Sequence, residues 1–542
     1  MLRAVAEQQQ KDSIVQTTSG KVRGYRASDV TIFKGIPYGA STAGQNRFMP
    51  PKRQPPWLGI RDVLEYGPMA MQPAIFTSET FAAWAATDSG RLMKGLIRWP
   101  LSGVSEDCLV LNVWTRGLGD GKKRPVMVWL HGGGFASGSG DWGWTDGTNL
   151  ARNDEVVVVS LNHRLNIFGF LYLDEIGGSK YTDSGNVGML DIVAALEWVR
   201  DNILAFGGDP GNVTVFGQSG GGCKVAALMA MPSAQGLFHR AIDMSGPCPK
   251  VLSREEATRA ATQVLDHLDI DCDHIELLQE VPAHKLLRAM NAVLAAANVE
   301  SGDNTWTDGT WFHMFDPVVD GHALPQHPFY PAAPEMSAQV PMLIGNMGYE
   351  DRSSVLEMLT SPNGLNETQV RARLSKLGIE NPHADQLIHG YRASRPDASL
   401  ADVFTAIVSD LEFRMDAIAM AERKAAQSKV PAYMYLFTWE SPAFGGKFKS
   451  PHSLDVPFVF DNIGLAPGIW GPKPDPRRYQ LAKNVSKAWV AFARTGNPNH
   501  SGLPEWKPYT LHDRATMLLN YSCELVNDPR REDRLVMEQL RS

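Results

Sequence analysis

The sequence predicts an α/β protein with a large, mostly parallel central sheet flanked by helices. Several short runs are continuously apolar and rich in β-branched residues, as expected for strands buried on both faces of a parallel sheet. Segments with helical spacing lie between these runs, and this alternation is typical of a sheet covered by helices. The predicted strands are residues 125–130, 156–161, 213–216, 340–344, 432–438 and 516–520, and the clearest helix is residues 191–203.

Nothing along the chain marks a boundary between domains. Glycine and proline are spread over all 542 residues, without an internal repeat, a low-complexity tract or a linker. Chains of this length usually divide into several domains, but some large α/β proteins fold as a single domain. We therefore expect a single domain over residues 1–542, with long insertions such as residues 305–315.

The composition is ordinary for a globular protein, with 43% hydrophobic and 20% charged residues. The net charge of −7 and the lack of a basic cluster argue against a nucleic-acid partner. No apolar run reaches the roughly 18 residues of a membrane span. The first 15 residues also lack the apolar core of a signal peptide, so we expect an intracellular protein without a membrane partner.

The cysteines give no sign of a disulfide scaffold or a zinc site. Five residues are too few and too scattered for a scaffold, and none lies in a C-x-x-C pair or at zinc-ligand spacing. We expect them to be small buried hydrophobic side chains and expect no metal. They are Cys108, Cys223, Cys248, Cys272 and Cys523.

Four glycines surround Ser219 in the stretch FGQSGGG, residues 216–222. Residues 217–221 match G-x-S-x-G, between a predicted strand and a segment rich in alanine, leucine and methionine. A nucleophile elbow needs this strand–turn–helix setting, because its serine takes a strained backbone conformation with no room for neighbouring Cβ atoms. The alternative is a glycine-rich turn with an incidental serine, and this segment alone does not decide between the two.

A second glycine cluster, HGGGF at residues 131–135, directly follows the predicted strand at residues 125–130. Such a loop can aim backbone N–H groups at the oxyanion of an acyl-transfer reaction. The predicted donors are Gly133, Gly134 and Gly220. Residues 138–143 formally match the dinucleotide-binding pattern G-x-G-x-x-G, but a helix should follow at once, and the next residues, WTDG, indicate more loop.

A serine nucleophile of this kind needs an acid and then a histidine later in the chain. Glu350 and Asp351 follow the predicted strand at residues 340–344. Of the later histidines, His452 lies in a loop after the strand at residues 432–438 and is favoured as the base. His383 and His389 lie in a predicted helix, and His500 and His512 in polar stretches near the C-terminus.

These motifs together resemble the type-B carboxylesterases, the cholinesterase-like branch of the α/β-hydrolase fold. The resemblance covers nearly the whole chain, through the blocks FKGIPY (33–38), SEDCLVLNV (105–113), GNVGMLD (185–191), FGGDP (206–210), PVVDG (317–321) and FARTGNPN (492–499). It implies that Ser219 is the nucleophile, Glu350 the acid and His452 the base. The base is followed in the family by an acidic residue and Phe-Val-Phe, here Asp455 and residues 458–460.

The chain departs from the family pattern at several positions. Gly220 stands where alanine is usual, and Asp351 stands where glycine is commoner. In secreted members, the cysteines that match Cys108 and Cys272 belong to two separate disulfides. Here the partner position of Cys108, in residues 69–72, and that of Cys272, near Glu280, hold no cysteine. These departures imply a reducing, cytoplasmic location. Trp99 is offset by one from the family's choline-stacking tryptophan, so that role is not carried over.

The resemblance implies a serine carboxylesterase that hydrolyses carboxylic esters through an acyl-enzyme on Ser219, with no cofactor. We expect a small-molecule ester as substrate and a monomer or small homo-oligomer. Alternatives are hydrolysis of a carbamate, thioester or amide, or a non-catalytic binding protein of cholinesterase type. Candidate walls of an apolar substrate cleft, each of which could equally be ordinary packing, are Trp142, Trp144, Trp306, Trp311 and Phe312.

Overall fold

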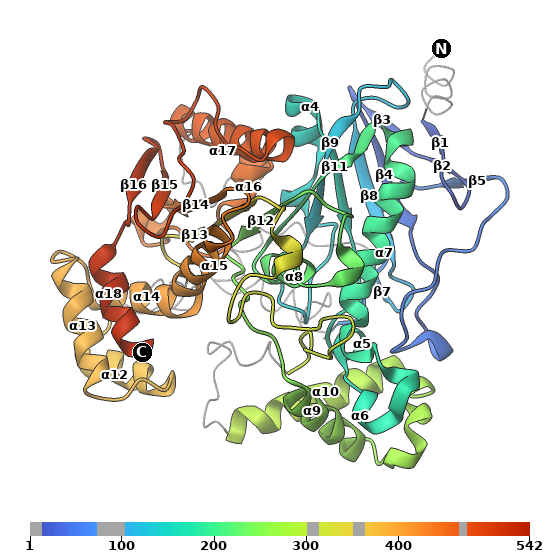
Figure 1. Cartoon of the computed structure of the whole chain (residues 1–542), viewed down its shortest axis with the longest axis horizontal. Helices are drawn as coiled ribbons and strands as arrows, with labels where there is room; N and C mark the ends of the chain where they lie inside the picture. Colours follow the sequence, from blue (N-terminus) through green and yellow to red (C-terminus); the bar gives the residue numbers. More distant parts are fainter. Residues whose placement is uncertain (1–12, 73–102, 301–313, 351–363, 466–473, 542) are drawn as a thin grey trace.

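The computed structural model describes residues 13–72, 103–350, 364–465 and 474–541, apart from residues 301–313. Its centre is an 11-stranded mixed sheet in the order β16-β15-β14-β13-β12-β11-β9-β10-β8-β4-β3 (Figure 1). The strands are β3 Tyr25–Ala27, β4 Val30–Pro37, β8 Val110–Thr115, β9 Arg124–Leu130, β10 Val157–Leu161, β11 Gly208–Gln218, β12 Arg240–Met244, β13 Met342–Met347, β14 Ala432–Phe437, β15 Ala515–Leu519 and β16 Glu524–Asn527.

The central part of this sheet, from β10 through β9 and β11 to β15, is parallel. Antiparallel strands β8, β4 and β3 extend it at one end, and β16 at the other. Two small sheets lie apart, one of β1 Ile14–Gln16, β2 Lys21–Arg23 and β5 Ile60–Asp62, the other of β6 Met69–Ala70 and β7 Val104–Ser105. The predicted fold class is therefore confirmed.

Both faces of the sheet are buried, and β9 shows why its sequence is continuously apolar. Val126 and Val128 point into one hydrophobic cluster, with the helices α7 Val187–Asn202, α8 Gly220–Leu228 and α15 Met415–Ala426. Met127 and Trp129 alternate with them and enter a second cluster with α4 Thr148–Asp154, α16 Val456–Val459 and α17 Pro476–Thr495. A strand with two apolar environments has no polar face to give it a period of two.

Further helices lie beyond these layers (Figure 1). The short helices α5 Asn166–Phe170 and α6 Asp174–Gly177 precede α7, and α9 Arg254–His267 and α10 Ala283–Glu300 pack together near α6. The helices α12 Glu367–Lys376, α13 His383–Ala393 and α14 Leu400–Ser409 gather with the C-terminal α18 Arg531–Arg541. Within the described part of the chain, no helix combines the length and apolarity needed to cross a bilayer.

All five cysteines are free thiols. Cys108 is buried, as predicted, whereas Cys223, Cys248 and Cys523 are only partly buried. The prediction is wrong for Cys272, which is exposed at the start of a short 3₁₀ helix. Three residues of that helix's eight are buried, and they are Ile275, Leu278 and Gln279, so the cysteine is not needed for packing there.

Candidate active site

Ser219 stands alone between the last residue of β11 and the first residue of α8. Its backbone has φ 59° and ψ −130°, a region that residues with a side chain rarely occupy. The amide of Ser219 donates to the carbonyl of Met244 on β12 at 2.9 Å, and its carbonyl accepts from the amide of Gly222 at 2.7 Å. The strained turn is thus fixed from both sides, and the half-buried serine has the geometry of a nucleophile elbow.

The surrounding glycines are required by close backbone packing. A Cβ on Gly217 would lie 2.4 Å from the carbonyl carbon of Gly221, and a Cβ on Gly221 would lie 2.1 Å from the oxygen of Leu130. Neither position tolerates a side chain, because the obstructing atoms are main chain. The glycines let α8 start directly against β9 and β11, which argues against an incidental flexible turn.

The second glycine cluster turns beside the start of α8. Gly133 and Gly134 have φ values of 94° and 60°, which favour glycine, and a Cβ on Gly133 would lie 2.5 Å from the oxygen of Ser137. An ideal Cβ on Gly220 would lie 2.2 Å from the carbonyl oxygen of Gly134 and 2.4 Å from its Cα. The structure therefore brings the three predicted oxyanion donors into one small region beside Ser219.

The competing dinucleotide-binding pattern at residues 138–143 has no structural support. Gly138 lies in a loop after β9, and the pattern runs into a three-residue 3₁₀ helix, Gly143–Thr145. The next helix, α4, begins only at Thr148, so no glycine turn passes directly from a strand into a helix.

Glu350 follows β13 and is 1% exposed. One carboxylate oxygen, Oε1, accepts from the amide of Met347 at 2.6 Å. The other, Oε2, lies 2.6 Å from Nδ1 of His452. The amide of Glu350 donates to Oγ of Ser409 at 2.7 Å, so main chain and carboxylate are both fixed. Asp351, the alternative acid, lies outside the described residues.

His452 lies in the loop between β14 and α16, with its ring 4.9 Å from that of Phe413. Because Nδ1 faces a carboxylate, the neutral ring carries its proton on Nδ1 and a lone pair on Nε2. Nε2 lies 3.0 Å from Nε2 of the Gln218 side chain, which can donate to that lone pair. Sequence reasoning did not find this contact, although Gln218 directly precedes Ser219.

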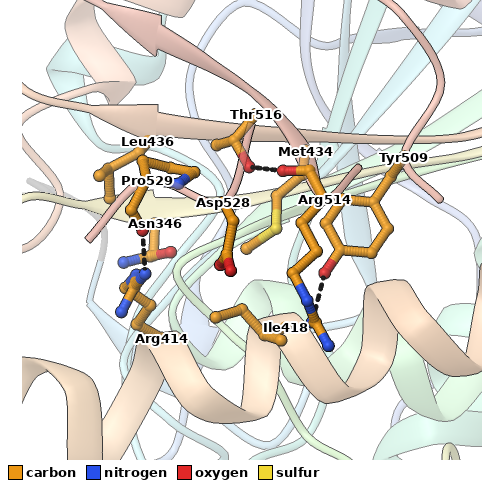
Figure 2. Close-up of a pocket in the computed structure, with 10 residues that line it drawn as sticks. All are labelled: Asn346, Arg414, Ile418, Met434, Leu436, Tyr509, Arg514, Thr516, Asp528 and Pro529. Atoms are coloured by element: carbon orange, nitrogen blue, oxygen red, sulfur yellow. Dashed lines mark hydrogen bonds between the residues drawn. The ribbon is translucent and has the colours of Figure 1, made fainter. Parts of the chain in front are cut away.

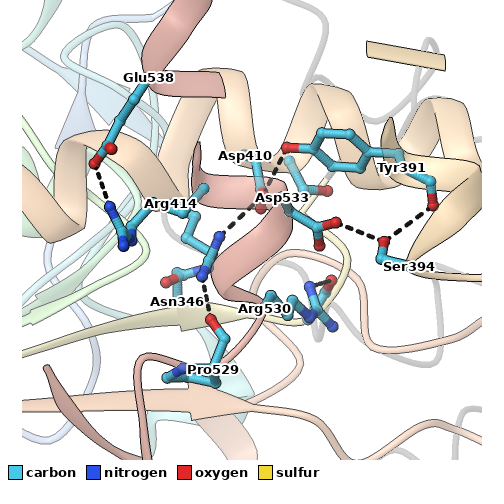
Figure 3. Close-up of polar contacts among 12 residues, drawn as sticks. Asn346, Tyr391, Ser394, Asp410, Arg414, Pro529, Arg530, Asp533 and Glu538 are labelled. Atoms are coloured by element: carbon cyan, nitrogen blue, oxygen red, sulfur yellow. Dashed lines mark hydrogen bonds and ion pairs between the residues drawn. The ribbon is translucent and has the colours of Figure 1, made fainter. Parts of the chain in front are cut away.

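Glu350 and His452 both contact the segment around a π-helical turn, η11, at Asp410–Arg414. Ser409, the last residue of α14, precedes the turn, and Phe413 within it packs on His452. Asp410 accepts from the hydroxyl of Tyr391 at 2.8 Å and pairs with Arg414 at 3.0 Å, which anchors the turn from behind (Figure 3). π-turns inside helices are frequent at functional sites.

Two further buried carboxylates lie near the acid. Burial, opposed by a hydrogen bond from the amide of Gly246, raises the pKa of Asp243 to about 7, and the charge of Glu350 adds to the rise. Burial likewise raises the pKa of Asp455 to about 7, although the hydroxyl of Tyr435 donates to it at 2.9 Å. The region behind the acid therefore disfavours additional negative charge.

The predicted cleft residues are only partly described. Trp144 is buried in the second hydrophobic cluster, and Trp142 is partly buried against that cluster with the two rings 5.7 Å apart. Their contact with a substrate stays a prediction. Trp306, Trp311 and Phe312 lie outside the described residues, as does Trp99.

A small cavity lies elsewhere, between α15 and strands β13–β15 (Figure 2). Its lining contains none of the predicted catalytic residues and includes Asn346, Arg414, Arg514 and Asp528. The described residues also contain no group of three or more metal-ligating side chains.

Comparison with known proteins agrees with this arrangement. The profile of the Carboxylesterase family matches residues 11–537. The para-nitrobenzyl esterase of Bacillus subtilis (strain 168) is 34% identical over 524 residues, which cover 96% of this chain and 97% of the relative. The phenmedipham hydrolase of Pseudarthrobacter oxydans is 31% identical, covering 97% of this chain and 99% of the relative.

Among solved structures, the carboxylesterase EST55 of Geobacillus stearothermophilus superposes with a TM-score of 0.79 at 35% identity, over 97% of this chain and 99% of that one. A structure of pNB esterase also has a TM-score of 0.79, at 33% identity and the same coverage. The chain therefore belongs to the carboxylesterase family.

Proposed function

We propose that this carboxylic-ester hydrolase works through an acyl-enzyme on Ser219, with His452 as general base and Glu350 as the group that orients it. The observation that carries the proposal is the pairing of a strained Ser219 with a buried Glu350–His452 hydrogen bond of 2.6 Å. Gly133, Gly134 and Gly220 would supply the oxyanion hole. This set is complete for acyl transfer by the serine–histidine–acid mechanism.

In the first half of the reaction, Oγ of Ser219 attacks the ester carbonyl carbon and its proton passes to Nε2 of His452. The electron pair of the carbonyl bond becomes an oxyanion, held by the N–H groups of the three glycines. Glu350 stabilises the imidazolium from the Nδ1 side. The alcohol then leaves with the proton from Nε2, and the acyl group stays on Ser219.

In the second half, water attacks the acyl carbon and gives a proton to Nε2 of His452. The bond between the acyl carbon and Oγ of Ser219 then breaks, His452 returns the proton to Oγ, and the carboxylic acid leaves. Gln218 takes part indirectly, because its side-chain amide nitrogen lies 3.0 Å from the same Nε2 of His452 that must accept the serine proton. The side-chain amide has to yield this position to Oγ of Ser219 in the first half-reaction and to the attacking water in the second.

We propose small carboxylic esters as substrates. One relative is named for hydrolysis of a para-nitrobenzyl ester, which gives the first compound to assay. Another is named for phenmedipham, a carbamate, which gives the first compound for the alternative class. Initial rates across a panel that varies acyl length and alcohol size would rank the esters. Parallel assays with a matched carbamate, thioester and amide would identify the alternative substrate classes.

The nucleophile is tested by labelling with a fluorophosphonate and by Ser219→Ala. We expect one adduct, on the peptide containing Ser219, and loss of turnover in the variant with little change in thermal stability. Ser428→Ala is the matched control, since Ser428 also has a positive φ (54°) but lies exposed on the surface. A Ser219→Ala enzyme that still turns over esters would refute the mechanism.

We further propose that the chain forms one catalytic domain, works in the cytoplasm and is a monomer or small homo-oligomer. Five free thiols support a reducing compartment. Light scattering of the purified protein and fractionation of the source cells test the last two points. A large assembly, or activity confined to the extracellular fraction, would contradict them.

A further inference from the structure

One buried charge near the proposed site has no role in the mechanism above. Lys224 is 0% exposed, and it lies on α8 four residues after Gly220. Residues four apart share one face of a helix, and side chains point back toward the helix N-terminus. The side chain of Lys224 therefore extends along α8 toward the helix N-terminus, where the proposed oxyanion hole lies. Its Nζ donates to the carbonyl oxygen of His131 at 2.8 Å, directly before the glycines 132–134.

Besides the carboxylate of Asp316, the groups that surround Lys224 are basic or apolar. The ring of Phe135 lies 5.6 Å from Nζ, and His131 stacks on His163 at 5.0 Å. Each imidazole has Nδ1 against the carbonyl oxygen of the residue that follows it, and no described residue hydrogen-bonds to either Nε2. Burial, and then the charge of Lys224, lowers the pKa of both histidines well below the usual value. Both rings are neutral, so the lysine is the local cation.

Burying an ammonium costs free energy that an apolar side chain of similar length would avoid. Lys424 on α15 shows how a structural lysine is satisfied in this protein. It is also buried, and its Nζ donates to the carbonyl of Ser337 at 2.6 Å and to the side chain of Gln427 at 2.7 Å. Within the described residues, Lys224 has one acceptor, and that acceptor begins the oxyanion loop. The ammonium of Lys224 therefore has fewer hydrogen-bond acceptors than that of Lys424.

We propose that Lys224 is a positioning residue of the oxyanion hole. Its ammonium holds the loop of Gly132, Gly133 and Gly134 against the helix that carries Ser219, and it adds positive charge beneath the developing oxyanion. This inference rests on the proposed roles of Ser219 and of the glycine donors. It adds a residue that contacts neither substrate nor reacting atoms.

The ammonium of Lys224 loses its proton within the pH range in which the enzyme can be assayed. Burial lowers its pKa to about 7, while Cys223 on the same helix and Asp316 on a neighbouring loop oppose that change. The neutral His131 and His163 complete the titratable groups that face it. The ammonium is present below this pKa and is lost as the pH rises through it, so its contribution to catalysis should fall over the same range.

The test compares Lys224→Met with the matched control Lys424→Met. For Lys224→Met we expect kcat to fall about 10- to 100-fold, less than the 10²- to 10³-fold typical of losing a direct oxyanion donor, with KM nearly unchanged. The affinity for a trifluoromethyl ketone, which forms a hemiketal oxyanion on Ser219, should fall by the same factor as kcat/KM. Lys424→Met should lower the melting temperature and leave kcat unchanged.

The pH dependence separates positioning by charge from simple packing. The ratio of wild-type kcat to Lys224→Met kcat should be larger at about pH 6 than at about pH 9, whereas a packing defect gives a constant ratio. If Lys224→Met does not fold, Lys224→Arg replaces it. Arginine keeps its charge, so kcat of that variant should not show the wild-type decline as pH rises.

The inference would be overturned if kcat of Lys224→Met equalled that of the wild type. It would also be overturned if kcat of Lys224→Arg had the same pH dependence as kcat of the wild type. Neither result would affect the proposed function, which fails separately if Ser219→Ala stays active.

Discussion

Replacing Gly220 by alanine should damage the proposed oxyanion hole, although the resemblance to the family implies alanine as the usual residue at this position. The new Cβ would lie 2.2 Å from the carbonyl oxygen of Gly134, and such contacts are essentially never shorter than 3.0 Å. Gly134 must therefore retreat by the difference, 3.0 minus 2.2, or about 0.8 Å. The obstructing atoms are main chain, so no side-chain rotation relieves the contact.

The size of the effect follows from this displacement. A misplacement of about 1 Å at a reacting centre can cost about 10²-fold in rate, equivalent to about 2.7 kcal/mol of activation free energy. We expect kcat of Gly220→Ala to fall by somewhat less than 10²-fold, with KM changed little, because substrate binding in the ground state does not use the full oxyanion contact.

The assay is steady-state hydrolysis of a chromogenic ester, with the melting temperature measured on the same preparations. Gly464→Ala is the control, since Gly464 has no atom within 4 Å of its added Cβ and an ordinary φ. A folded Gly220→Ala enzyme with wild-type kcat would show that the loop shifts without loss. The argument that glycine here sets the spacing of the hole would then be wrong.

Two other substitutions test the electrostatics of the site. Gln218→Glu places a carboxylate about 3 Å from Nε2 of His452, where it stabilises the imidazolium, so the acid limb of the pH–rate profile should move up by about one pH unit or more; an unmoved limb would contradict the contact. Burial raises the pKa of Asp243 from 3.8 to about 7, so the folded state holds this proton more tightly than the unfolded state. The free energy of unfolding should therefore fall by up to about 4 kcal/mol as the pH rises between those values. Asp243→Asn should remove that loss, and urea unfolding at both ends of the range would show it; an equally steep pH dependence in the variant would refute the assignment.

The sequence predicted those parts of the sheet whose strands are continuously apolar. It missed the antiparallel strands β3, β4, β8 and β16 at the two ends of the sheet. It also missed the central strand β12, whose sequence RAIDM carries two charged residues. Asp243 in that strand is buried and accepts a hydrogen bond from the amide of Gly246, an arrangement that exists only after β12 is packed beside β11 and β13. The α7 helix starts at Val187, before the predicted residue 191. Gly188 weakens the helical pattern of the sequence, so the first turn of the helix was not predicted.

Some residues of the candidate site could be predicted from the sequence and others could not. Ser219, Glu350 and His452 have recognisable positions because the order of a triad and the strand–turn setting are properties of the chain. The contact of Gln218 with His452, the π-turn at Asp410–Arg414 and the burial of Lys224 depend on how distant segments pack. Lys224 in particular lies in a segment whose alanine, leucine and methionine content gives no sign of a buried charge.

The strand order has a consequence for how the enzyme is made. The glycine loop follows β9, Ser219 follows β11, Glu350 follows β13 and His452 follows β14. These strands lie close together in the sheet, but long stretches of chain separate them in the sequence. Even the strained turn at Ser219 depends on Met244 from the later strand β12. Pairings so distant in sequence form slowly. We therefore expect a chain truncated before His452 to have no esterase activity, and regain of activity during refolding to follow the pairing of β9, β11, β13 and β14.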